Sequence, residues 1–94
     1  MSNKAEVELA AVLDISKVEA LYEELEAITN GVHDVIIKAD KVERVDTSCL
    51  QTLLSFKNLI SQHGDVMQWD APSENLIAVA GRLGLIEELG IPAV

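Results

Sequence analysis

The amino-acid sequence predicts an α/β fold, in which helices pack on a mixed, mainly parallel sheet of about four strands. Apolar segments of strand length alternate along the chain with segments whose apolar residues recur at helical spacing, in the order β-α-β-α-β-α. The 94 residues suffice for one domain and are too few for two, and a hydrophobic fraction of 49% supplies its core. We therefore expect a single domain over residues 1–94.

The first part of the chain predicts a strand followed by a capped helix. Residues 7–13 (VELAAVL) form a short apolar run with one charge, which indicates a strand. Ser16 and Glu19 have the spacing of a capping box, in which each side chain bonds the backbone N–H of the other residue. Asn30-Gly31 is typical of a helix end. Between these signals the apolar residues recur at helical spacing and should face the sheet: Val18, Leu21, Tyr22, Leu25 and Ile28.

A second strand and a second helix are predicted in the middle of the chain. Residues 34–39 contain a β-branched run that suits a buried central strand. Asp46-Thr47-Ser48 combines three residue types that favour helix N-caps, and we expect a helix to begin near Ser48. Its apolar residues share one broad arc: Cys49, Leu50, Leu53, Leu54, Phe56 and Ile60. Lys57 lies within this arc, where we expect its side chain to extend to solvent at the rim.

The last third of the chain predicts one more strand and two helical segments. Residues 66–69 are a strand that follows the turn at 63–65. Ser73 is the expected N-cap of the next helix, and Gly84 is its expected end. The inward stripe of this helix is Leu76, Ile77, Ala80 and Leu83. Residues 85–89 are expected to form a further helical turn.

Charge excludes some classes of partner. The chain has 16 acidic and 7 basic residues, a formal net charge of −9. This charge repels nucleic acid and anionic membrane surfaces, so neither is an expected partner. No apolar run approaches the roughly 20 residues that span a bilayer, and the polar N-terminus has no signal-peptide pattern. We expect a cytoplasmic protein without direct membrane insertion.

The sequence offers little for catalysis, and we expect a non-enzymatic protein without a metal or cofactor. His33 and His63 stand far apart, Cys49 belongs to no cysteine pair, and no phosphate-binding glycine loop is present. Cys49 lies on the inward arc of its helix and is expected to be buried and structural. An enzyme with a nucleophile at Cys49 or Ser48 remains a third hypothesis, although only the two histidines could serve as its base.

The hydroxyl cluster Asp46-Thr47-Ser48 supports two interpretations. One of its side chains caps the following helix and does nothing else. Alternatively, a hydroxyl at this helix start is phosphorylated, because free backbone N–H groups and the helix dipole would tolerate the phosphate. The added charge would then act on a bound partner while the fold survives.

The order of motifs resembles the STAS domain of bacterial anti-sigma-factor antagonists and related single-domain proteins. The resemblance covers the chain from Val7 onward and is carried by residues 45–50 (VDTSCL), His63-Gly64 and residues 72–85. Cys49 stands where these proteins usually have glycine. The strand with which they usually begin has almost no room before residue 7.

The resemblance implies a protein-interaction module for signal transduction, in which phosphorylation switches the partner. The phosphoacceptor position falls on Ser48, whose hydroxyl is then expected to face solvent, with Thr47 as the alternative. Asp46 would orient the loop, and these three residues together with Gln51 would contact the partner. That partner would be a kinase-type anti-sigma factor, with a phosphatase reversing the modification.

The chain is also similar to the STAS subunit of bacterial phospholipid-transport ABC complexes. That subunit sits on the cytoplasmic ATPase and supports its assembly without phosphorylation. In this alternative Thr47 and the exposed helix face would be permanent contacts with the ABC transporter ATPase.

Overall fold

The computed structural model describes residues 4–29 and 34–92, and its main sheet has three parallel strands. These are β1 (Lys4–Glu8), β3 (Asp34–Lys38) and β5 (Met67–Asp70), in the order β1-β3-β5. Two short strands, β2 (Val12–Leu13) and β4 (Arg44–Val45), form a second parallel sheet. The predicted α/β fold with mainly parallel strands is confirmed, although its strands are divided between two sheets.

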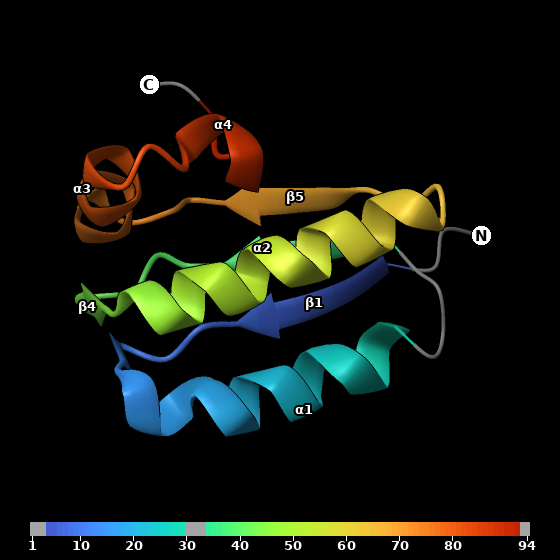
Figure 1. Cartoon of the computed structure of the whole chain (residues 1–94), viewed down its shortest axis with the longest axis horizontal. Helices are drawn as coiled ribbons and strands as arrows, with labels where there is room; N and C mark the ends of the chain where they lie inside the picture. Colours follow the sequence, from blue (N-terminus) through green and yellow to red (C-terminus); the bar gives the residue numbers. More distant parts are fainter. Residues whose placement is uncertain (1–3, 30–33, 93–94) are drawn as a thin grey trace.

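The helices pack beside and over the main sheet (Figure 1). A 3-10 turn, η1 (Ile15–Lys17), leads into α1 (Val18–Thr29). The long α2 (Thr47–Gln62) lies beside α1, and both helices start at the end of the molecule that carries β4. The chain finishes with α3 (Glu74–Arg82) and α4 (Ile86–Leu89).

The core lies between the sheet and the helices. Strand side chains alternate between buried and more exposed positions, as expected when one face of a sheet is covered. The largest fully buried side chains come from strands, helices and the β3–β4 loop: Val7, Leu25, Val35, Ile37, Val42, Cys49, Leu50, Leu53, Leu76 and Leu89. On the uncovered face, Lys38 Nζ pairs with Glu6 Oε1 at 3.0 Å.

The strand predicted over residues 7–13 is wrong in its extent. The hydrogen-bond ladder between β1 and β3 ends where Leu9 N donates to Lys38 O at 2.9 Å, and the chain then bends. Ala11 O accepts hydrogen bonds from the backbone N–H groups of Glu43 and Arg44, at 2.8 and 3.1 Å, next to the small sheet. The run contains no glycine or proline to mark this break, which is made by pairing with a distant segment.

The predicted capping box is also wrong. Asp14, rather than Ser16, caps this segment: its Oδ1 accepts from Ser16 N at 3.1 Å, and the Ser16 hydroxyl donates to the same carboxylate. In α1, Leu21 and Leu25 are buried as predicted, whereas Tyr22 is 58% exposed. The expected helix end at Asn30-Gly31 lies outside the described residues.

The second half of the chain follows the predictions more closely. On α2, Leu54 and Lys57 are half-buried, and the rest of the expected arc is buried. Ser73 Oγ accepts from Leu76 N at 3.1 Å and caps α3 as predicted. Leu83 is 42% exposed rather than inward. None of the described helices is both long and apolar enough to cross a membrane.

Candidate functional site

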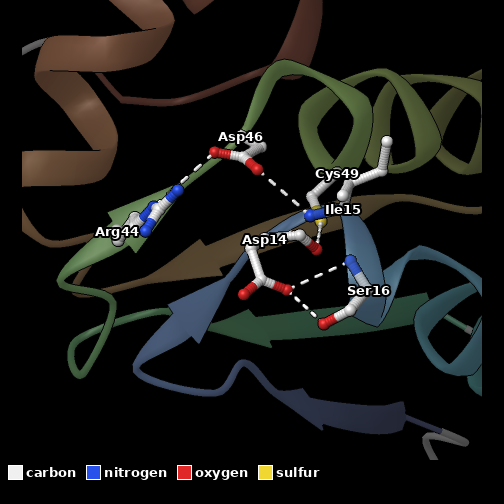
Figure 2. Close-up of polar contacts among 6 residues, drawn as sticks. All are labelled: Asp14, Ile15, Ser16, Arg44, Asp46 and Cys49. Atoms are coloured by element: carbon white, nitrogen blue, oxygen red, sulfur yellow. Dashed lines mark hydrogen bonds and ion pairs between the residues drawn. The ribbon is translucent and has the colours of Figure 1, made fainter.

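The candidate site lies at the start of α2, where the ends of β2 and β4 converge. Parallel strands bring their carboxyl ends to one edge of a sheet, so the loops that follow them meet there. We call this region the loop edge and define it as residues 14–16 and 44–49. Figure 2 shows polar contacts that join its two segments, which are about 30 residues apart in the chain.

Asp46 ties the two segments of the loop edge together. Its backbone has the extended conformation of an N-cap, with φ −90° and ψ 155°, yet its carboxylate caps no N–H of α2. Oδ2 instead accepts from Ile15 N at 3.1 Å, and Oδ1 lies 3.8 Å from Arg44 Nε (Figure 2). Asp46 N also donates to Leu13 O at 2.9 Å. The first N–H groups of α2 are therefore left without a side-chain acceptor from the N-cap residue.

Asp14 holds the other segment in place. It caps η1 through Ser16, as described above, and its backbone oxygen faces the Cys49 thiol at an S–O distance of 3.5 Å (Figure 2). The pKa of Asp14 is lowered, mainly by the hydrogen bond from the Ser16 side chain and further by the positive charges of Lys17 and Arg44. Asp14 therefore stays ionised at neutral pH.

The two neighbouring hydroxyls of the site differ in exposure. Ser48 Oγ is buried and has no hydrogen-bond partner among the described residues. Thr47 is exposed and is the first residue of α2. The expectation that Ser48 presents its hydroxyl to solvent is therefore corrected, because this residue of the first turn directs its Oγ inward. Phosphorylation of either residue stays a prediction.

Cys49 is fully buried, as predicted. Burial raises the pKa of its thiol, and the negative charges of Asp46 and Asp14 raise it further. The thiol is thus kept in its less nucleophilic, protonated form, which argues against a cysteine nucleophile here. Among the described residues no cluster of three or more histidine, cysteine or acidic side chains could hold a metal ion.

The remaining candidate residues lie on α2 or beyond it. Gln51 is exposed one turn after Thr47, on the same helix. His63 follows the other end of α2, about 24 Å away at 1.5 Å per residue. His63 therefore cannot act as a base for a nucleophile at the loop edge. His33 lies outside the described residues.

Sequence reasoning missed three participants in the site, namely Asp14, Ile15 and Arg44. Asp14 had a local signal, because an aspartate two residues before a serine is a common cap or turn. The contributions of Ile15 and Arg44 depend on the pairing of β2 with β4, which leaves no pattern along the chain.

The sequence matches one family model, described as Mlab, STAS domain, over residues 1–90. This range includes every element described above. A search of curated proteins finds no significant match.

Proposed function

Because the chain belongs to the STAS domain family, as the Mlab-type match over residues 1–90 shows, we propose that it is a non-enzymatic docking module controlled by phosphorylation of Thr47. A STAS domain is in general a protein-interaction module, of the kind found in anti-sigma-factor antagonists. One observation carries the choice of acceptor: at the loop edge the Thr47 side chain is exposed, and the Ser48 hydroxyl is enclosed.

The start of α2 suits a phosphate on Thr47. The Asp46 carboxylate is turned toward Ile15, so the first N–H groups of α2 are not occupied by it. A phosphate there meets these groups and the positive end of the helix dipole. Arg44, whose side chain is 67% exposed, lies nearby on the same strand–helix connection and offers a further positive charge. The fold should therefore tolerate the modified residue.

The phosphate changes the binding of the partner rather than the fold. Phosphorylation adds a charge of about −1.5 to −2 at neutral pH. The loop edge already carries the carboxylates of Asp14 and Asp46, which makes the modified surface strongly negative. A partner that packs apolar or acidic groups there is released. We propose a kinase-type anti-sigma factor as this partner, with a phosphatase restoring the bound state.

Phosphosite mapping by mass spectrometry tests this proposal on protein recovered from its source cell. We expect one phosphate on Thr47, retained in Ser48→Ala and lost in Thr47→Ala. Loss of the phosphate in Ser48→Ala together with its retention in Thr47→Ala would assign the acceptor to Ser48 and refute our choice. Binding of the purified kinase to the unmodified and phosphorylated forms should differ by at least about tenfold.

A second function is supported by the hydrogen bonds that connect the two segments of the loop edge. Contacts from Asp14 and Asp46 hold both of its segments before any partner binds, and preorganisation of this kind favours a permanent interface. In this alternative the domain docks on the ATPase of a phospholipid-transport ABC complex. Co-purification of an ABC ATPase with unphosphorylated protein, unaffected by Thr47→Glu, would favour this function over the switch.

A further inference from the structure

A groove between α1 and α2 has an apolar floor and two exposed apolar walls. Its volume is about 620 Å³. Leu25 and Phe56 are buried at its floor, and Tyr22 and Leu59 line it with 58% and 41% of their surface exposed. An exposed leucine alone needs no explanation, but exposed apolar side chains that share a concave surface are typical of an interaction site.

The dimensions of the groove fit a helix. On α2 its lining runs from Gln51 to Gln62, about 16 Å at 1.5 Å per residue, or three helical turns. Apart from Glu26, the polar lining residues in the described part of the chain are uncharged: Thr29, Gln51, Thr52, Ser55, Asn58 and Gln62. A helix that presents apolar side chains at positions i, i+3 or i+4, i+7 and i+11 would span this length and fill the apolar floor.

The electrostatics of the groove select positive charge. Of the lining residues that the structure describes, Glu26 alone is charged, and α1 carries three more glutamates and no lysine or arginine. The pKa of the Tyr22 hydroxyl is raised, mainly by its hydrogen bond with Glu26 and secondly by the negative charge of Glu26. Because α1 and α2 run in the same direction (Figure 1), the negative ends of both helix dipoles lie at one end of the groove. Neither helix has a basic residue in its last turn to neutralise that end.

We propose that this groove docks a cationic amphipathic helix of a partner protein, with the lysines or arginines of that helix over Glu26 and Thr29. The groove begins at Gln51, one turn after Thr47, and extends from there toward the other end of α2, and the proposal does not depend on phosphorylation. A second copy of this chain is disfavoured as the occupant because each copy carries a net charge of −9. An anionic membrane is disfavoured for the same reason.

A displayed library of randomised amphipathic helices about 14 residues long, almost four turns and so longer than the groove, is the probe for this proposal. The library is selected on the full chain and counter-selected on Leu59→Gln. We expect Leu59-dependent sequences rich in lysine and arginine, concentrated at one end of the helix. A failure to recover Leu59-dependent sequences, or recovery of neutral or acidic ones, would overturn the proposal.

Fluorescence anisotropy with a selected peptide measures the contribution of the Leu59 wall. Leu59→Gln should weaken binding at least about tenfold, a loss of about 1.4 kcal/mol. Leu83→Gln is the matched control, since Leu83 is 42% exposed but lies outside the groove, and it should change affinity less than about twofold. Equal losses of affinity in the two variants would assign binding to general surface hydrophobicity and refute the groove as the binding site.

Charge substitutions test the preferred polarity. Glu26→Lys should weaken binding of the peptide several-fold and reduce the salt dependence of its affinity. Glu88 is exposed on α4 and does not line the groove, so Glu88→Lys, with the same change in net charge, should do neither. Equal weakening by both would contradict a local role for Glu26.

Two further results would reject a partner helix as the occupant of the groove. One is a dimer of the wild type, seen by sedimentation, that Leu59→Gln dissociates. The other is Leu59-dependent binding to phosphatidylserine vesicles.

Discussion

Introduction of a carboxylate at Ser48 should destabilise the fold, while the same change at Thr47 should not. Ser48 Oγ is enclosed and finds no hydrogen-bond partner within residues 4–29 and 34–92, so aspartate at this position brings a charge into a space where these residues offer it no partner. Thr47 is exposed in the first turn of α2, where a negative charge interacts favourably with the helix dipole. Adjacent residues with the same substitution should therefore respond with opposite signs.

The magnitudes follow from these environments. An unsatisfied buried polar group costs about 1–3 kcal/mol and a charged one more, so we expect Ser48→Asp to lose about 3 kcal/mol of unfolding free energy. A domain of this size has roughly 5–14 kcal/mol in total. The expected fall in Tm is about 12–24 °C, at 4–8 °C for each kcal/mol. Thr47→Asp should gain about 0.3–1 kcal/mol and raise Tm by a few degrees.

Thermal unfolding followed by circular dichroism measures both variants, with Ser48→Ala as the control. Removal of an unpaired buried hydroxyl should leave stability unchanged or increase it slightly, by up to about 1 kcal/mol. Equal shifts for the two aspartate variants would refute the difference in exposure. A loss of more than about 1 kcal/mol in Ser48→Ala would show that this hydroxyl has a partner in solution.

Three further predictions concern the rest of the fold. The pKa of Asp14 is lowered from its ordinary value of 3.8, so its ionised carboxylate stabilises the fold at pH values above 3.8, and this contribution disappears as the pH falls through the folded-state pKa. The Tm difference between wild type and Asp14→Asn should therefore shrink between pH 7 and about pH 2.5. A Tm difference that stays constant over this range would contradict the prediction. Trp69 Nε1 donates to Leu89 O at 2.8 Å in a buried position, so Trp69→Phe should cost about 1–3 kcal/mol in urea unfolding, and a neutral result would show that the bond adds nothing. The Cys49 thiol should react with a disulfide reagent at neutral pH only at the rate of unfolding; rapid labelling of the folded protein would revive a reactive thiol.

Local signals made most of the fold predictable. The cap at Ser73, the buried arc of α2 and the short turn of α4 all follow from residues close together in the chain. The division of residues 7–13 between two sheets could not be predicted in this way. It arises because Ala11 O and Leu13 O accept hydrogen bonds from the segment around β4, about 30 residues later.

The candidate site was predictable in position but not in detail. Three cap-forming residues before an apolar helical pattern marked the start of α2 to within one residue. Which hydroxyl faces solvent depends on the direction of each side chain in the first helical turn, and adjacent residues there point about 100° apart. The groove was missed because Tyr22 was assigned to the inward stripe of α1, and because an exposed Leu59 carries no signal until α1 lies beside it.

The two-stranded sheet of β2 and β4 has a consequence for how such a domain can diverge. It joins Leu13 and Val45 as paired neighbours, and Asp46 accepts a hydrogen bond from Ile15, so two distant stretches of chain are held against each other. Homologues that acquire new partners should therefore change these stretches together rather than one at a time. The buried side chains on the covered face of the main sheet are constrained by packing against the helices and need not change when the partner changes.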